Sequence, residues 1–131
     1  MPINDPTGPL AKAFVTAIRS AETAVGDRFY SPVPEKREYP YGNVGEIQVI
    51  NELIEDFSGA EIYLTIHGWS QKNSKQEIYT IGRQFIAALD EADLSNGELT
   101  VNSCLLQDAN YLDDPDGKTS HVALTFHILT D

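Results

Sequence analysis

Apolar residues recur along the chain with two different periods, and each period predicts one kind of secondary structure. In residues 9–25 and 73–92 the apolar positions lie three and four residues apart, the spacing of one buried face on a helix. These positions are Leu10, Phe14, Ile18, Ala21 and Val25 in the first segment, and Ile78, Ile81, Phe85, Ala88, Leu89 and Ala92 in the second. We expect two helices, the first ended by Gly26 and the second begun by a capping box of Ser74 and Glu77.

Four other segments have the alternation or the composition of strands. Residues 60–70 and 121–129 alternate strictly between apolar and polar side chains, so each predicts a strand with one buried face. The buried sets are Ile62, Leu64 and Ile66, and Val122, Leu124, Phe126 and Ile128. Residues 44–54 predict a third strand. Residues 99–111 predict a fourth, in which the alternation slips at Ser103 and Cys104 and indicates a bulge.

The predicted elements follow one another as helix, hairpin, helix, hairpin. Pro32, Pro34 and Pro40 predict an extended surface segment after the first helix, and "DDPDGK" at residues 113–118 predicts the turn of the second hairpin. We interpret residues 1–131 as a single α+β domain of order α-β-β-α-β-β. In it, a mostly antiparallel four-stranded sheet carries both helices on one face. A chain of 131 residues is long enough to bury a core without disulfides.

Charge is the most unusual bulk property, with 20 acidic against 9 basic side chains and a formal net charge of −11. Binding of duplex DNA requires lysine and arginine side chains that neutralise its phosphates, so the chain is a poor candidate for a nucleic-acid-binding protein. The simplest interpretation is that the charge maintains solubility. No apolar run approaches the roughly 20 residues of a bilayer-spanning helix. The first residues contain no export signal, and the single Cys104 fits a reducing cytoplasm.

Three short motifs resemble chemical sites, and each fails on its spacing. His67 lies on the outward face of its predicted strand, and His121 and His127 lie on that of the last strand, where His67 and His127 approach each other if the two strands are neighbours. A zinc site, however, needs three or four ligands in tetrahedral geometry, and the sequence has one thiol, Cys104, and no His-Glu-x-x-His motif. "GWSQK" has Lys72 where a nucleophile elbow requires glycine. Around Gly117, the first and last ligand positions of a calcium loop lack the required Asp and Glu. The sequence therefore predicts no enzyme, no metal and no cofactor.

The strand faces that point away from the helices need a different explanation. Tyr63, Trp69, Ala123 and Leu129 would leave apolar area on that side. Exposed apolar patches beyond roughly a few hundred Å² usually mark a surface that binds a partner. We therefore predict that the side opposite the core is a protein interface. Its predicted contact residues are Tyr63, His67, Trp69, Thr125 and His127.

Five segments, taken together and in order, resemble one known family over most of the chain. They are "VGDRFYSPVPE" at 25–35, "YPY" at 39–41, "GAEIYLTIHGWSQ" at 59–71, "IYTIGRQFIAALDEA" at 78–92 and "LDDPDGKTSHVALTFHIL" at 112–129. In this order and spacing they are similar to the phage tail-completion, or tail-terminator, proteins of long-tailed phages, prophages and gene transfer agents. The chain departs from the family at Gly68, where a bulkier residue is common, and in its acidic first hairpin.

The resemblance implies a structural role without catalysis. Such proteins cap the head-proximal end of the tail tube and join it to the capsid connector, and they assemble as rings, usually hexamers, with DNA passing through the middle. The implied partners are copies of the same chain, the tail tube protein and the head–tail connector or stopper protein. DNA is only a passing cargo, and no membrane is involved. The implied location is the head-proximal end of the virion tail, after assembly in the host cytoplasm.

A ring of this kind suggests a second interpretation of the acidic charge, besides its lying on the outer rim. A conduit for DNA benefits from walls that repel the duplex, and this repulsion acts within about 8 Å at physiological salt. We predict that acidic residues of the two hairpin turns line the channel. The candidates are Glu52, Glu55 and Asp56 in the first turn, and Asp113, Asp114 and Asp116 in the second.

Three alternative functions remain open. Another head–tail joining subunit or a tail-tube protein belongs to the same structural class, and a tube protein would polymerise into an open filament. A small enzyme or ligand-binding module needs a concave pocket with convergent polar groups, and no cluster in the sequence indicates one. A non-catalytic regulatory module would use the same sheet face for a partner outside the phage.

Overall fold

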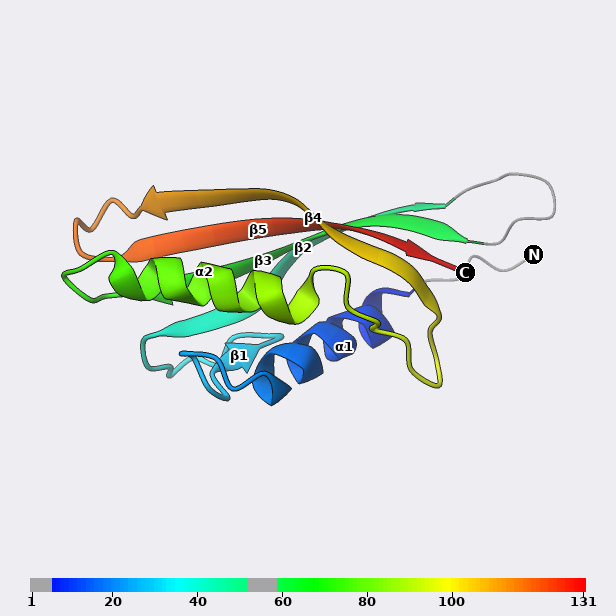
Figure 1. The fold of residues 1–131 in the computed structure, drawn as a ribbon. Helices are drawn as coiled ribbons and strands as arrows, with labels where there is room; N and C mark the ends of the chain where they lie inside the picture. The colour runs from blue at the N-terminus through cyan, green and yellow to red at the C-terminus, as the bar shows by residue number, and fades with distance from the viewer. Residues whose placement is uncertain (1–5, 52–58) are drawn as a thin grey trace.

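The computed structural model describes residues 6–51 and 59–131, which form two helices and five strands (Figure 1). The helices are α1 (Thr7–Ser20) and α2 (Gln76–Leu89). The strands are β1 (Phe29–Tyr30), β2 (Tyr41–Asn51), β3 (Ala60–Ser70), β4 (Val101–Asp113) and β5 (Ser120–Thr130). In this described part of the chain, both helices fall short of the length and apolar character of a bilayer-spanning segment.

The strands form one mixed sheet in the order β1-β2-β3-β5-β4. The four long strands pair antiparallel, and the second hairpin folds back so that β5, rather than β4, lies beside β3. Figure 1 shows both helices on the same side of the sheet. The predicted α+β class and both predicted helices are confirmed, whereas the predicted number of strands is not.

The fifth strand, β1, corrects the prediction of a four-stranded sheet. It lies in the segment that its prolines predicted to be extended surface, and it pairs parallel with β2, Phe29 opposite Gly42 and Tyr30 opposite Asn43. The backbone N–H of Gly42 donates to the carbonyl of Arg28 at 2.9 Å. Phe29 is fully buried, so this short strand is held by its side chain in the core as well as by backbone pairing.

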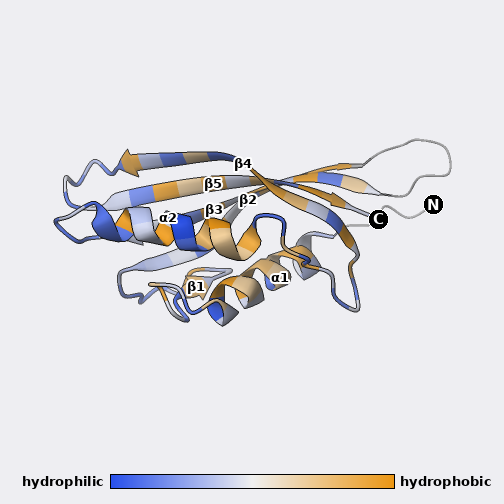
Figure 2. Cartoon of the chain, viewed as in Figure 1, coloured by the Kyte–Doolittle hydropathy of each residue, from blue (hydrophilic) through white to orange (hydrophobic). Residues whose placement is uncertain are grey.

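The core lies between the helix layer and one face of the sheet. On β3 and β5 every second residue is buried, as their alternation predicted. Helices α1 and α2 each turn an apolar stripe toward these residues, and Figure 2 shows the hydrophobic and hydrophilic sides of both helices. Phe14 of α1 meets Phe126 of β5 edge to face at 5.8 Å between ring centroids. The inward sets of both strands are therefore the ones that the sequence predicted.

Helix α1 ends at Ser20, earlier than the predicted stop at Gly26. Glu22 adopts a φ of 54°, in the left-handed region, which takes the chain off the helical path. Val25 lies beyond the helix and is still fully buried, because the loop after the helix folds it into the core. Val25 was thus correctly predicted as a core residue but wrongly placed on the helix.

The start of α2 also differs from the prediction, because the expected capping box does not form. The hydroxyl of Ser74 accepts a hydrogen bond from the backbone N–H of Gln76 at 3.0 Å. Glu77, however, accepts a bond from the hydroxyl of Ser70 at 2.7 Å instead of reaching back to Ser74. Since Ser70 is the last residue of β3, this bond ties the first turn of α2 to the sheet.

The pairing register shifts at three places. One shift on β4 lies between Val101 and Ser103, where the slipped alternation indicated a bulge, so that prediction is confirmed. A second on β4 follows Leu106, and a third on β2 falls between Val44 and Ile47. The sequence analysis predicted neither of these two, and the shift on β2 shapes the site described below.

Two facing glycines allow α2 to approach the sheet closely. Gly42 of β2 pairs with Gly68 of β3, and the ring of Phe85 lies over both. A Cβ atom on Gly42 would lie 2.6 Å from the carbonyl oxygen of His67 and 3.1 Å from Phe85 Cζ. The same ring meets Phe29 edge to face at 5.4 Å. The glycine at position 68 therefore has a packing reason, because a larger residue would push α2 away.

We expect Gly42→Ala to destabilise the protein by about 1–3 kcal/mol, because the added methyl group overpacks against a backbone carbonyl that cannot move independently. Chemical unfolding followed by far-UV circular dichroism measures the change. Gly97→Ala is the matched control, since a Cβ there meets nothing within 4 Å, and it should shift stability by less than about 0.5 kcal/mol. Equal effects of the two substitutions would contradict the close-packing explanation.

Candidate functional site

The face of the sheet away from the helices is called the open face here, and it consists of the strand residues that alternate with the buried ones. Strand register arranges these residues in rows that cross β2, β3, β5 and β4. The row nearest the second hairpin turn is Tyr41, Trp69, His121 and Leu112, and the next is Asn43, His67, Ala123 and Asn110. Toward the other end lie the rows Gln48, Tyr63, His127 and Leu105, and Ile50, Glu61, Leu129 and Ser103.

All five predicted interface residues lie on this open face. Tyr63, His67 and Trp69 come from β3, and Thr125 and His127 come from β5, each half-buried. Register brings some of them together: the rings of Tyr63 and His127 lie 5.0 Å apart between centroids. The hydroxyl of Thr125 shares a 2.9 Å hydrogen bond with that of Thr65. Whether these residues contact a partner stays a prediction.

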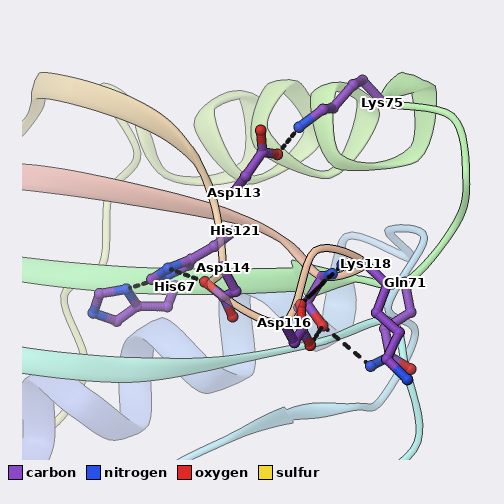
Figure 3. A network of polar contacts seen from close by, with 9 residues as sticks. His67, Gln71, Lys75, Asp113, Asp114, Asp116, Lys118 and His121 are labelled. Carbon is purple, nitrogen blue, oxygen red and sulfur yellow. Dashed lines mark hydrogen bonds and ion pairs between the residues drawn. The ribbon is translucent and has the colours of Figure 1, made fainter.

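The two histidines that the sequence placed on one face do not meet each other. Strands β3 and β5 are neighbours, but His67 lies opposite Ala123 and His127 lies opposite Tyr63. The partner of His67 is instead His121, whose Nε2 lies 2.8 Å from His67 Nδ1 (Figure 3). Alternation alone put His121 on the correct face, but only the register of the two strands could identify it as the partner.

Carboxylates lie at both ends of this histidine pair. Glu46 Oε1 is 2.9 Å from His67 Nε2, and Asp114 Oδ1 is 3.8 Å from His121 Nδ1. The hydrogen bond from His67 lowers the pKa of Glu46 below its ordinary value. Burial lowers the pKa of His121, and the charge of His67 lowers it further. At neutral pH, Glu46 is therefore ionised and His121 is uncharged.

The bulge on β2 is what brings Glu46 onto His67. The register shift between Val44 and Ile47 places Gly45 and Glu46 in the bulge, beside Thr65. A Cβ atom on Gly45 would lie 2.5 Å from the ring of His67, so only glycine leaves room for the imidazole. Glycine at position 45 and the acid at position 46 thus act together to hold the ring.

Stacked rings cover part of the same end of the open face. Trp69 stacks on Tyr41 at 4.9 Å and on His121 at 4.7 Å between centroids, with interplanar angles of 24° and 16°. His67 stacks on Trp69 as well, at 5.5 Å. Aromatic pairs of this kind contribute roughly 0.5–1.5 kcal/mol beyond the burial of their area. The only tryptophan of the chain is therefore a structural part of the subunit as well as a surface group.

The opposite end of the open face is more apolar. Leu105 is 45% exposed, and Ile50 and Leu129 are each 39% exposed. They come from β4, β2 and β5, in the two rows farthest from the second hairpin turn. Between them, Glu61 and His127 form an ion pair at 2.7 Å if the histidine is protonated. We call Ile50, Leu105 and Leu129 the apolar end.

Charge on the four long strands has a single sign. All nine lysines and arginines of the sequence lie outside β2, β3, β4 and β5. The carboxylates of Glu46, Glu61 and Asp108 belong to the open face, together with its histidines. The strand side chains of the open face therefore include no lysine or arginine, and Arg37, from the segment before β2, lies over the ring of Tyr41 at 5.3 Å.

The three acids of the second hairpin turn have local partners. Asp113 forms an ion pair with Lys75, and Asp114 faces His121 (Figure 3). Asp116 accepts hydrogen bonds from the backbone and hydroxyl of Thr119, at 2.8 and 2.5 Å, and these bonds lower its pKa. These contacts stabilise the turn and leave the predicted channel position untested. The candidates Glu52, Glu55 and Asp56 lie outside the described residues.

The described residues do not assemble a metal-binding constellation. In residues 6–51 and 59–131, no group of three or more His, Cys, Asp or Glu side chains has the arrangement of a metal site. Burial raises the pKa of Cys104 to about 12, so this thiol stays protonated and is a poor nucleophile. A hollow of about 400 Å³ lies between α1 and residues 93–98, away from the histidine pair.

We expect Trp69→Ala to destabilise the subunit by about 2 kcal/mol, because it removes the centre of the stack. The loss is smaller than for an aromatic residue of the core, since Trp69 is only half-buried. Urea unfolding followed by circular dichroism measures this. Leu112→Ala is the control, since Leu112 lies in the same row and is 51% exposed, and it should cost less than about 0.5 kcal/mol. A Trp69→Ala effect as small as that of the control would mean that the stack contributes nothing to stability.

Comparison with known proteins agrees with the predicted resemblance. The family model described as "Tail completion protein gp17" matches residues 10–131. A chain in the solved structure "Virion of native gene transfer agent (GTA) particle" has a similar fold, with a TM-score of 0.82 and 17% sequence identity, over 95% of this chain and 96% of that one. No curated protein matches the sequence. Because the family model covers nearly the whole chain, the protein belongs to the tail completion protein gp17 family, whose role in the phage tail is structural.

Proposed function

We propose that this protein completes a phage tail by closing a ring on the head-proximal end of the tail tube and joining it to the capsid connector. Six copies form the ring, DNA passes through its centre, and no step involves catalysis. The tail tube protein binds one side of the ring, and the connector or stopper protein binds the other. Assembly takes place in the host cytoplasm, and the finished ring lies in the virion tail.

The open face is the observation that supports this proposal most directly. A sheet with helices on one face only leaves its second face for a partner, and here that face includes the exposed side chains Ile50, Leu105 and Leu129. The opposite surface is built of helices, so a contact between the open face of one copy and the helices of the next joins two different surfaces. Contacts between two different surfaces are heterologous and generate rings when the rotation between copies closes. The predicted interface residues Tyr63, His67, Trp69, Thr125 and His127 belong to this contact.

The charge distribution supports the passage of DNA without adhesion. No lysine or arginine lies on the four long strands, so the strands themselves offer no cation that neutralises phosphates. Asp113, Asp114 and Asp116 of the second hairpin turn line the channel in this proposal, together with Glu52, Glu55 and Asp56 of the first. Their repulsion keeps the duplex mobile within about 8 Å of the wall at physiological salt.

Two alternatives make different predictions. Another joining subunit or a tail-tube subunit would use the same surfaces but extend into an open filament. A non-catalytic binding module would stay monomeric and use the open face for an unrelated partner.

Ring formation is tested by imaging and mass photometry of the purified protein, alone and mixed with tail tubes. We expect discs with a central hole, at tube ends in the mixture. The double substitution Leu105→Lys and Leu129→Lys should abolish the discs, because it places two cations in the apolar contact. Asn73→Lys is the control on the exposed loop between β3 and α2, outside both the open face and the helices, and it should leave the discs intact.

Filaments in place of discs would favour a tube subunit, and a monomer under all conditions would contradict the ring. Disc formation by the double variant would show that the open face is not the contact.

The channel wall is tested by charge reversal. Asp113→Lys should make the assembled protein retain duplex DNA at low salt, with an affinity that falls steeply as salt increases. Glu98→Lys carries the same charge change on an exposed loop and should not retain DNA. An electrophoretic shift assay at several salt concentrations measures both. Equal retention by the two variants would place the second hairpin turn outside the channel.

A further inference from the structure

A line of four titratable side chains crosses the open face and joins three strands to the second hairpin turn. Glu46 of β2 contacts His67 of β3 at 2.9 Å, and His67 contacts His121 of β5 at 2.8 Å. His121 faces Asp114 of the turn at 3.8 Å (Figure 3). The proposed channel and contact functions leave unexplained why two imidazoles face each other directly between two carboxylates.

Without an added proton, the line has one consistent arrangement of hydrogens. Glu46 is an acceptor, so His67 Nε2 carries a hydrogen and His67 Nδ1 has none. In the 2.8 Å contact His121 Nε2–H therefore donates to His67 Nδ1, which leaves His121 Nδ1 unprotonated. A bare nitrogen and the Asp114 carboxylate are both acceptors, which agrees with their separation of 3.8 Å, beyond hydrogen-bond length.

One proton fits the line without breaking any contact. It binds to His121 Nδ1, the only ring nitrogen of the pair left bare and outside their contact. His121 then donates to His67 with one nitrogen and can donate to Asp114 with the other. A single positive charge lies between two carboxylates, an arrangement that shortens and strengthens the hydrogen bonds. The first proton therefore draws the second hairpin turn toward the sheet.

A second proton cannot be taken up with the contact intact. The remaining basic atom is His67 Nδ1, which already accepts the hydrogen from His121. Protonating it places two N–H groups and two positive charges against each other at 2.8 Å, so the rings must separate. Since Trp69 stacks on both imidazoles, their separation also loosens the stack.

We propose that His67 and His121 form a two-step proton switch on the open face. The first proton strengthens the contact between the two rings and the contact of His121 with the hairpin turn, and the second proton separates the rings. The effect of this switch on ring assembly rests on the proposed function, because the same face makes the contact between copies. When low pH separates the two imidazole rings, the stack of Tyr41 and Trp69 is disrupted, and the contact between copies weakens.

The groups around the pair are compatible with this behaviour. From β2 the ionisable neighbours are Glu46 and Tyr41, from the turn it is Asp114, and the residues that β4 places in these two rows, Asn110 and Leu112, carry no charge. The pKa of His121 is lowered by burial first and by His67 second. A lowered folded-state pKa means that the unfolded chain binds the proton more readily. Burial thus outweighs the attraction of Asp114 for the proton, so the stability contributed by neutral His121 is present above about pH 6.5 and is lost as the pH falls, although the proton adds a hydrogen bond to the turn.

The switch is tested on the wild-type subunit by recording the ring Hε1 resonances of the histidines and the emission of Trp69 from pH 8 to pH 4.5. We expect His67 and His121 to titrate together in two steps separated by more than about one pH unit. The emission of Trp69 should change mainly in the lower step. Independent single-site titration of the two rings would overturn the switch.

Two variants assign the steps. His121→Gln should leave a single step for His67, and Asp114→Asn should move the first step to lower pH, because it removes the carboxylate that receives the new hydrogen. His127→Gln is the control, since His127 contacts Glu61 and Tyr63 in another row, and both steps should remain. An unchanged first step in Asp114→Asn would contradict the role given to the turn.

Mass photometry across the same pH range tests the consequence for assembly. The fraction of discs should fall in the lower titration step, at least tenfold relative to pH 8. A constant fraction of discs through that step would overturn the regulatory role. Absence of discs at every pH would overturn the proposed ring function instead, while the spectroscopic titration would still decide whether the switch exists.

Discussion

A β-sheet has two faces, and the described residues of this chain provide a layer of helices for only one of them. A β-sheet with apolar side chains on both faces is stable only if each apolar region is packed against protein and the rest is polar enough to face water. On the open face, the chain itself covers one end by stacking Tyr41, Trp69 and His121, and by pairing His67 with Glu46. The other end keeps Leu105 and Leu129 exposed. The proposed contact between copies follows from this incomplete cover.

The two ends of the open face therefore serve different purposes. At the histidine end, the side chains satisfy one another, so this end stabilises the subunit before any partner arrives. At the apolar end, the exposed side chains gain little within the subunit and would gain more by burial against another molecule. A subunit that must fold alone and then assemble needs both properties. The sheet supplies them without a further domain.

Electrostatics and packing point to the same kind of molecule. The strands carry acids and histidines but no lysine or arginine, and the thiol of Cys104 is buried and protonated. Strands without lysine or arginine offer no cation of their own to phosphates, and a protonated thiol is a poor nucleophile. This agrees with the structural role in the phage tail that membership of the tail completion family indicates.

The sequence by itself determined the local features of this protein: two helices, the buried sets of β3 and β5, the second hairpin turn, and the family. These follow from periods of two and of three to four residues, which depend only on neighbours along the chain. The tertiary structure decided that Phe29 starts a fifth strand, that Glu77 bonds Ser70, and that His121 rather than His127 meets His67. Alternation assigns a residue to a face, but its partner depends on strand order, register and bulges, which residues far apart in the chain set together.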